Sequence, residues 1–388
     1  MSSLDYDIIV VGAGPSGTTA ARRCAEKGLK VALIEKHEQP GMKVCAGGLD
    51  SRVIEDFDIS KDIVQCHTET YRLYGSSGRI AIKEVESATV YRRDFDQYLA
   101  ARATDAGATL LTSTRCLGVL REGDRVKGVD VKTSEGKKRI KAQIVIAADG
   151  FNSVTAKSAG LQTSYHPRDY GLTVQREIRV ASGVQRSAKH LFYGRDVSRC
   201  GFGWIYPKRS SYTVGVGCLV SRIEKNQLVR NLEYLIRRHP IGSRILTDST
   251  HISKVQAAPV PLKLSPKMFG NGVLVTGDAA GQVSPLGGNG IYYAMKAGAM
   301  AGETAANAII HEDVSASALS QYQKEWTLVF GEDLKRQKRI LELVEPWYNL
   351  YMEAKILLDS HASIKKIVSK GRNPARSLLR LRWREFKD

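Results

Sequence analysis

Three glycines near the start of the chain, Gly12, Gly14 and Gly17, have the spacing GxGxxG in the run GAGPSG. Residues 6–12 form a continuous apolar run typical of a buried strand, and residues 15–27 have the pattern of a helix. The glycines therefore lie where a strand ends and a helix begins. Backbone N–H groups at such a helix start bind phosphate, and glycine lets the phosphate approach the backbone.

Glu35 ends a second predicted strand, residues 30–35, and follows Gly12 by 23 positions. A carboxylate there can accept hydrogen bonds from both ribose hydroxyls, whereas it would repel a 2′-phosphate. A lone GxGxxG is often only a tight turn, but strand, helix, strand and terminal acid together predict an adenine dinucleotide site. The residues expected to bind it are Gly12, Gly14, Pro15, Ser16, Gly17, Glu35 and Lys36.

A second glycine-rich segment, GDAAG at 277–281, follows the apolar strand GVLVTG and leads to a Gly-Gly-Asn-Gly loop before a helix. Asp278 can bind the ribityl hydroxyls of a flavin, and loop amides at a helix start can stabilise the anion of a reduced flavin. Alternatively, these glycines form only a strand-to-helix connection. The candidate residues here are Gly277, Asp278, Gly287, Gly288, Asn289, Gly290 and Ile291.

GAGPSG with Glu35, ADG at 148–150 and GDAAG at 277–281 occur in the same order in flavoproteins similar to para-hydroxybenzoate hydroxylase, and the chain resembles that group. The resemblance implies bound FAD. It also implies that Asp149 and Gly150 lie near the pyrophosphate and that Arg92 lies near the cofactor.

Two further segments resemble motifs of the geranylgeranyl reductases within that superfamily. MKVCAGGL is similar to their flavin-proximal cysteine motif, which would hold Cys45, Ala46 and Gly47 against the cofactor, and GFGWIYPK is similar to their Tyr-x-Trp-x-Phe-Pro signature. Ala46 stands where many relatives have glycine, and Phe202 and Tyr206 replace the usual Tyr and Phe. The resemblance spans roughly residues 5–310 and implies an FAD-dependent reductase that saturates C=C bonds of geranylgeranyl chains, in isoprenoid membrane phospholipids of the archaeal type.

Cys45 is the candidate catalytic residue. It stands between Lys43 and Gly47, in a loop where backbone dipoles and a nearby cation can lower the pKa of a thiol. Such a thiol can donate a proton to an alkene or orient it. The alternative is a small apolar filler beside the flavin.

Phe202, Trp204 and Tyr206 alternate along a predicted strand that Pro207 ends, so their rings share one face. They can line an apolar channel for polyprenyl chains. Rings at this spacing are also common in an ordinary sheet core.

Several other functions share these motifs. A flavin hydroxylase with an aromatic substrate has the same cofactor motifs, and a reductase of chlorophyll or quinone side chains has the same landmarks. Flavin halogenases have a Trp-x-Trp-x-Ile-Pro tract, from which this chain departs at Phe202 and Tyr206. A non-catalytic flavin-binding or lipid-carrier protein is a further alternative.

The pattern of elements predicts an α/β protein with a Rossmann-like FAD-binding domain assembled from discontinuous segments, residues 1–60, 88–164 and 259–314. Segments 61–87 and 165–258 are expected to form an antiparallel-sheet substrate domain, with predicted strands at 171–180, 189–193, 202–207 and 211–219 and a helix at 225–238. Residues 315–388 are expected to form a helical C-terminal region.

The chain has 388 residues and a formal charge of +18, which favours anionic partners. Residues 362–388 carry nine Lys or Arg against two acidic residues, so this tail can meet an anionic membrane surface, or it can be a solvated terminal helix. No nucleic-acid-binding pattern and no metal-ligand spacing accompany the charge. We expect a cytoplasmic protein without a signal peptide, peripheral to the membrane at most, whose external electron donor is a ferredoxin, a quinol or NAD(P)H.

Overall fold

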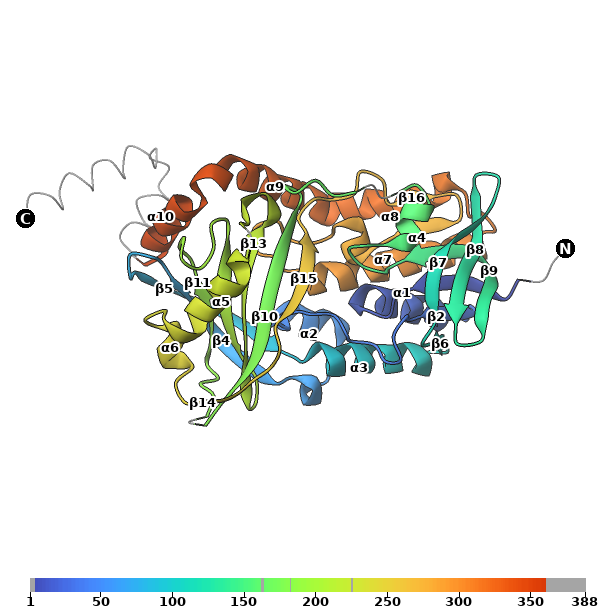
Figure 1. The fold of residues 1–388 in the computed structure, drawn as a ribbon. Helices are drawn as coiled ribbons and strands as arrows, with labels where there is room; N and C mark the ends of the chain where they lie inside the picture. The colour runs from blue at the N-terminus through green and yellow to red at the C-terminus, as the bar shows by residue number, and fades with distance from the viewer. Residues whose placement is uncertain (1–3, 162–163, 182, 225, 361–388) are drawn as a thin grey trace, which may run out of the picture.

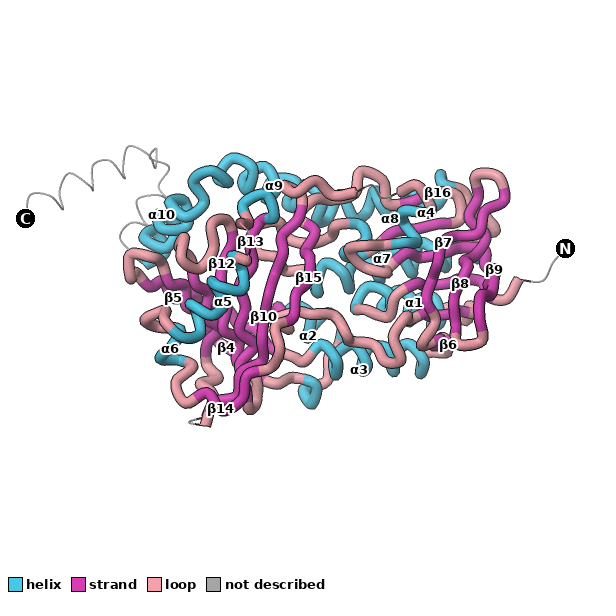
Figure 2. Tube along the Cα trace, in the orientation of Figure 1, coloured by secondary structure: helices cyan, strands magenta, loops and turns pink. Residues whose placement is uncertain are grey.

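A computed structural model describes residues 4–161, 164–181, 183–224 and 226–360. The basic tail 362–388 lies outside these described residues. Two sheets form the frame of the molecule, one near each end (Figure 1), and helices and loops lie between and around them (Figure 2).

The first sheet follows the order β16-β17-β9-β1-β2-β6, in which β17, β9, β1, β2 and β6 are parallel. The antiparallel ribbon β7–β8 continues from β9. Its strands are β1 (Tyr6–Val11), β2 (Val31–Ile34), β6 (Thr109–Leu111), β7 (Arg115–Glu122), β8 (Arg125–Thr133), β9 (Gly136–Ala147), β16 (Phe269–Gly270) and β17 (Val273–Val275).

Alternation along β1 explains how both faces of this sheet are covered. Ile8 and Val10 pack on the side of the helices, whereas Ile9 and Val11 pack against the apolar side of the β7–β8 ribbon. The strands are apolar on both faces because both faces are buried. The helices on the first side include α1 (Pro15–Glu26), α7 (Ile291–Ile310) and α8 (Ala316–Trp326).

Helices α1 and α7 approach closely because α7 presents glycines to α1. A Cβ atom at Gly298 would lie 2.2 Å from the carbonyl oxygen of Ser16, and one at Gly302 would lie 2.7 Å from that of Ala20. Only glycine fits such a contact without displacing one helix. The N-termini of both helices are therefore held at the same edge of the sheet.

The second sheet follows the order β14-β10-β13-β12-β11-β4-β5-β3 and is antiparallel except between β11 and β4. Its strands are β3 (Gly48–Asp50), β4 (Cys66–Tyr74), β5 (Ile80–Thr89), β10 (Tyr170–Val180), β11 (Ala188–Phe192), β12 (Gly201–Pro207), β13 (Ser211–Leu219), β14 (Ser249–Ile252) and β15 (Gln256–Pro261), which pairs with β10.

Helix α5 (Gln227–Arg237) covers one face of the second sheet. A Cβ atom at Gly203 would lie 2.9 Å from Cδ2 of Leu235, so α5 is on the face of β12 opposite to the side chains of its neighbours Phe202 and Trp204. The remaining helices are α2 (Ser51–Phe57), α3 (Arg92–Asp105), α4 (Val154–Ser158), α6 (Gly242–Ile245), α9 (Glu332–Val344) and α10 (Tyr348–Ser360).

The predicted α/β class is confirmed, and so is the antiparallel character of segments 171–180, 189–193, 202–207 and 211–219. The expected helical region after 315 is confirmed as far as Ser360, with a π-helical turn at Thr327–Gly331 and a 3-10 turn at Glu345–Trp347, where Pro346 interrupts the run. None of the helices that the structure describes has the length and apolar composition needed to cross a membrane.

Candidate active site

The GAGPSG turn is packed so tightly that two of its glycines have no room for a side chain. A Cβ atom at Gly12, where φ is +104°, would lie 2.5 Å from the carbonyl oxygen of Ala148, and one at Gly17 would lie 1.9 Å from that of Gly12. A Cβ atom at Gly14 would meet nothing within 4 Å. Helix α1 begins at Pro15, and no side chain caps its first N–H groups. The turn thus has an open space beside free backbone donors, which suits an anion.

Glu35 lies directly beside this turn. Its carboxylate is buried and accepts hydrogen bonds from the backbone N–H of Ala13 at 3.1 Å and of His37 at 3.0 Å. These bonds fix the carboxylate and leave lone pairs that can accept ribose hydroxyls. Lys36, the next residue, is exposed.

The ADG segment meets the same turn from another strand. A Cβ atom at Gly12 would lie 3.0 Å from Cα of Asp149, so the two motifs are in contact. The carboxylate of Asp149 accepts from the backbone N–H of Thr155 at 3.0 Å and from its hydroxyl at 2.9 Å, and it also bonds Ser153. Asp149 therefore holds the start of α4, while Gly150, with φ of +81°, turns the chain away.

The GDAAG segment joins α1 and α7. The hydroxyls of Ser16 and Thr276 are 2.9 Å apart, and Asp278 forms an ion pair with Lys43. Gly277 turns with φ of +68°, and Oδ1 of Asp278 lies 3.6 Å from the Cβ position of Gly290, at the start of α7. No side chain caps α7 either. The loop residues Gly287, Gly288 and Asn289 and the first helical residue Ile291 lie at this same helix start.

Two uncapped helix N-termini, an open space at Gly14 and a fixed carboxylate at Glu35 are the parts that a dinucleotide with an anionic diphosphate requires. The residues present therefore fit FAD.

The cysteine loop, residues 41–47, contacts the GDAAG segment through Lys43 and strand β10 of the second sheet through Cys45. The backbone N–H of Gly47 donates to Sγ of Cys45 at 3.3 Å, and the guanidinium of Arg92 also interacts with this thiol. Nε2 of Gln175 donates to the carbonyl of Cys45 at 3.1 Å. All six cysteines are free, and Cys45 alone among them is not buried. Cys24 is fully buried as expected, and burial raises the pKa of its thiol.

Lys208 clamps the cysteine loop to the end of β5. Its Nζ donates to the carbonyls of Ala46 and Val90, both at 2.8 Å, and the side chain is only 1% exposed. Burial lowers the pKa of Lys208 to about 8. Gly47 is required there, since its φ is +69° and a Cβ atom would lie 2.0 Å from the carbonyl oxygen of Val90.

Arg92 is the first residue of α3, next to the same loop, and forms a buried, bidentate ion pair with Asp96. The two hydrogen bonds are 2.8 and 2.6 Å long. A Cβ atom at Gly41 would lie 2.7 Å from the carbonyl oxygen of Arg92, so the loop rests directly on the start of α3. Arg92 thus links the α3 start with the Cys45 thiol.

The three aromatic residues of β12 lie on the face of the strand opposite to α5. The ring centroids of Phe202 and Trp204 are 6.2 Å apart, and Trp204 lies over Gly215, whose Cβ atom would be 2.1 Å from the indole ring. Nε1 of Trp204 is buried and has no hydrogen-bond partner among the described residues. The ring of Tyr206 lies against Gly48, at 2.8 Å from the Cβ position, and Tyr206 also interacts electrostatically with Cys45. The structure therefore brings the aromatic strand and the cysteine loop together.

Sequence reasoning missed the polar residues that join these two parts. Besides Lys208, they are Lys189 on β11 and Glu177 on β10, whose carboxylate accepts from the hydroxyl of Tyr91 at 2.8 Å. Burial raises the pKa of Tyr91 to about 12. One signal was available: Lys189 alternates with Leu191 in a β-rich segment, which places it on the same face as an apolar neighbour.

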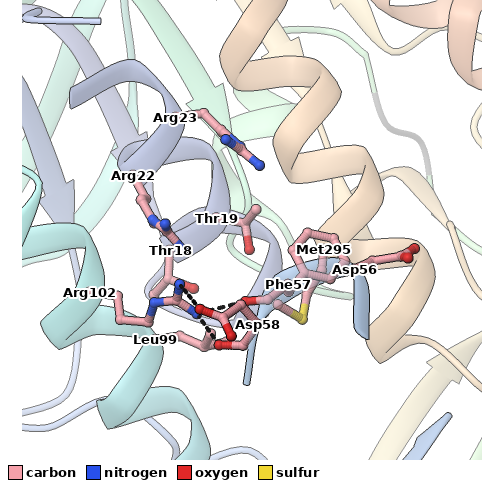
Figure 3. A pocket seen from close by; sticks show the side chains of 10 residues that line it. All are labelled: Thr18, Thr19, Arg22, Arg23, Asp56, Phe57, Asp58, Leu99, Arg102 and Met295. Carbon is pink, nitrogen blue, oxygen red and sulfur yellow. Dashed lines mark hydrogen bonds and ion pairs between the residues drawn. The ribbon is translucent and has the colours of Figure 1, made fainter. Parts of the chain in front are cut away.

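A pocket alongside α1 is distinct from these residues (Figure 3). Its arginines are already engaged: Arg102 donates to the carbonyls of Phe57 at 2.7 Å and Asp58 at 2.9 Å, while Arg22 and Arg23 pair with Glu26. It contains none of the residues expected to act in binding or catalysis. Its lining is Thr18, Thr19, Arg22, Arg23, Asp56, Phe57, Asp58, Leu99, Arg102 and Met295.

The family profile described as FAD binding domain matches residues 5–332. The digeranylgeranylglycerophospholipid reductase of Methanocaldococcus jannaschii is 36% identical to this chain over 347 residues, which cover 88% of this chain and 87% of that protein. The digeranylgeranylglycerophospholipid reductase 2 of Methanopyrus kandleri is 34% identical over 339 residues, 86% of this chain and 85% of that protein.

Among solved structures, a geranylgeranyl bacteriochlorophyll reductase-like protein from Thermoplasma acidophilum has a TM-score of 0.86 and 27% identity, covering 97% of this chain and 99% of that one. A flavin-dependent brominase has a TM-score of 0.77 at 17% identity, with 99% of this chain and 100% of that one covered, and this likeness shows the fold alone. These matches confirm the expected FAD cofactor and the resemblance to geranylgeranyl reductases.

Proposed function

This chain belongs to the FAD-binding family of the digeranylgeranylglycerophospholipid reductases, and from that premise we propose that it saturates the C=C bonds of geranylgeranyl chains on a glycerophospholipid. It is an FAD-dependent oxidoreductase of the geranylgeranyl reductase type. The observation that carries the assignment to this chain is the contact between Tyr206 of the aromatic strand and Gly48, the residue that follows the cysteine loop.

The residues that would hold FAD come from the motifs at the two helix starts. The N–H groups of α1 would bind the diphosphate beside Gly14, Glu35 the adenosine ribose, and Asp278 the ribityl chain, while α7 would direct its N–H groups at the flavin ring. FAD, when reduced, supplies hydride to one alkene carbon. Completing this set are Gly12, Pro15, Ser16, Gly17, Lys36, Cys45, Ala46, Gly47, Arg92, Asp149, Gly150, Gly277, Gly287, Gly288, Asn289, Gly290 and Ile291.

The protein must also protonate the neighbouring alkene carbon, because an unactivated alkene does not accept hydride alone. Cys45 is the proposed proton donor, since Gly47 and Arg92 fix its thiol and it is not buried as the other cysteines are. Phe202, Trp204 and Tyr206 would form the wall along which the isoprenoid chain lies, so that water is excluded from the reacting bond.

The test is mass spectrometry of a geranylgeranyl glycerophospholipid incubated without oxygen with chemically reduced protein. We expect each saturated bond to raise the lipid mass by that of one hydrogen molecule, while the flavin is reoxidised. Unchanged lipid mass, together with oxygen-dependent NAD(P)H consumption on an aromatic substrate, would instead indicate a hydroxylase.

Replacing Cys45 by alanine tests its role separately. Turnover should fall about tenfold or more, while the absorption spectrum of bound flavin stays unchanged. Turnover equal to that of the unaltered protein would reduce Cys45 to a packing residue.

The electron donor is proposed to be one of three classes, a ferredoxin, a quinol or NAD(P)H. GAGPSG is the one dinucleotide fingerprint in the sequence. The lack of a second fingerprint favours an electron donor that binds only transiently. Supplying each donor in turn to the oxygen-free lipid assay distinguishes them.

We also propose peripheral contact with an anionic membrane. The basic sequence 362–388 begins two residues after α10. Upstream of it, in the segment from the end of α9 to the start of α10, Leu343, Trp347 and Leu350 are between 68% and 77% exposed. The protein should float with vesicles that contain phosphatidylglycerol and remain behind with phosphatidylcholine alone. Equal behaviour with both vesicle types would contradict the contribution of charge.

A further inference from the structure

Lys189 is a completely buried lysine near the start of β11. Its exposed fraction is 0%, and among the described residues no carboxylate lies within ion-pair distance of it. Nζ donates to the hydroxyl of Tyr71 at 3.3 Å and to the carbonyl of Leu49 at 3.4 Å. It also lies over the rings of Tyr71 and Tyr206, at 5.2 and 5.4 Å from their centroids. A buried ammonium without a counter-ion is costly, so its presence calls for a use.

The two tyrosines continue from this lysine toward the cysteine loop. The rings of Tyr71 and Tyr206 meet edge to face with centroids 6.5 Å apart, and their side chains interact electrostatically. The ring of Tyr206 then lies against Gly48 and interacts electrostatically with the thiol of Cys45. A chain of polar groups thus runs from Lys189 through two hydroxyls to the proposed proton donor.

The environment of Lys189 makes it able to give up a proton near neutral pH. Burial, and next the positive charge of Lys208, lower the pKa of Lys189 to about 7. The other groups that face it are Asp50 on β3 and Cys66 on β4, which act in the opposite direction. Burial raises the pKa values of Tyr71 and Tyr206, so both tyrosines stay protonated and can pass a proton as hydroxyls.

Tyr206 is also a departure from the signature of the geranylgeranyl reductases, which has Phe at this position and Tyr at the position of Phe202. The hydroxyl is therefore four residues farther along β12, which is about 13 Å at the usual rise of a strand. In this chain it lies at the cysteine loop, in contact with the Lys189 environment.

We propose that Lys189, Tyr71 and Tyr206 form a proton supply to the thiol of Cys45, an inference that rests on the reductase function and on Cys45 as its proton donor. When the Cys45 S–H bond breaks and a C–H bond forms, the O–H proton of Tyr206 moves to the sulfur. Tyr206 regains a proton from Tyr71, and Tyr71 regains one from the Lys189 ammonium, which becomes a neutral amine. Water restores the ammonium between turnovers, and no further electrons are required.

The test compares Lys189→Met and Tyr206→Phe with the unaltered holoenzyme. The measured quantity is the rate at which the lipid reoxidises the reduced flavin in the absence of oxygen, from about pH 5.5 to pH 9. The rate of the unaltered enzyme should fall as pH rises through about 7, the pKa of Lys189. Both variants should be slower by about 10- to 100-fold, should lack this pH dependence and should keep the unaltered KM. Tyr212→Phe, which removes a buried hydroxyl elsewhere in the same sheet, should retain both rate and pH profile.

The double variant Lys189→Met/Tyr206→Phe separates a shared chain from two independent packing defects. Members of one chain are not additive, so the double variant should be no slower than the worse single variant. The proton supply would be overturned if the rate losses of the two single variants multiplied in the double variant, or if the single variants kept the unaltered pH profile. Lipid reduction by the unaltered protein would not be affected by either result. Should the unaltered protein itself leave the lipid mass unchanged, the reductase function would fail instead.

Discussion

The two halves of the candidate site are built from different parts of the polypeptide. Around GAGPSG and GDAAG the site consists of backbone: glycines without room for a side chain, uncapped helix starts and one fixed carboxylate. Between β12 and the cysteine loop it consists of buried side chains, chiefly Lys208 and Lys189, which donate to backbone carbonyls, and Tyr206, over whose ring Lys189 lies.

This difference decides how each half responds to substitution. A backbone site depends on close approach, so one added methyl group can destroy it. A site of buried polar side chains depends on compensation, because each charged or polar group needs its partner. The replacements below test the contrast.

The largest effect is expected from Gly17→Ala. Its added Cβ would lie 1.9 Å from the carbonyl oxygen of Gly12, a backbone atom that cannot move aside, so we expect no stably folded protein. Gly14→Ala is the matched control, because its Cβ would meet nothing within 4 Å. This variant should unfold at the unaltered temperature without cofactor but bind FAD at least about tenfold more weakly. Unaltered FAD affinity in Gly14→Ala would place the diphosphate elsewhere.

Arg92→Met comes next, because it leaves the carboxylate of Asp96 buried and unpaired. Chemical denaturation should show a loss of about 3–5 kcal/mol. The double variant Arg92→Met/Asp96→Leu should recover most of that loss, since both charges are gone. If Arg92→Met were as stable as the unaltered protein, water would have to solvate the Arg92 and Asp96 side chains in the folded state.

Lys189→Met should stabilise the protein. The pKa of Lys189 is about 7 in the folded state against an ordinary 10.5, so the folded state disfavours the ammonium. The cost to stability appears as pH falls below 10.5 and is complete below about 7. The gain in melting temperature of the methionine variant should therefore be larger at pH 6 than at pH 10. A gain that does not depend on pH would show that the pKa of Lys189 is the same in the folded and the unfolded protein.

The smallest effect on stability is expected from Lys43→Met. The side chain of Lys43 is 43% exposed, so breaking its ion pair with Asp278 should change the unfolding free energy by less than about 1 kcal/mol. Asp278→Asn should weaken FAD binding more than Lys43→Met does. The reverse order, measured by flavin fluorescence, would assign the cofactor contact to the lysine.

The backbone half could be predicted from the sequence because its signals are local. Gly12, Gly17 and Glu35 lie within one strand-helix-strand unit, and the helix and both strands were placed to within a residue or two. Asp149 was expected at the pyrophosphate; it does lie against Gly12, but the sequence did not indicate that its carboxylate also holds α4.

The side-chain half could be predicted only in part. Cys45 and the three rings of β12 were found through their resemblance to family motifs, whereas Lys208 and Lys189 were not singled out. Their function depends on partners far along the chain: Lys208 bonds residues 46 and 90, and Lys189 bonds residues 49 and 71. The helix or strand periodicity of a short sequence segment does not indicate contacts between residues so far apart in the chain. Strand β3 was also missed, since its three residues form a strand only by pairing with β5.

The glycine contact between α7 and α1 has a consequence for how the protein is made. Ser16 meets Thr276 and Gly298, so the N-terminal turn is complete only after residues near 300 are in place. On the ribosome, a nascent chain has the GAGPSG turn long before it has the helix that supports it. Flavin loading is therefore expected after synthesis of most of the chain, and a truncated product would stay colourless.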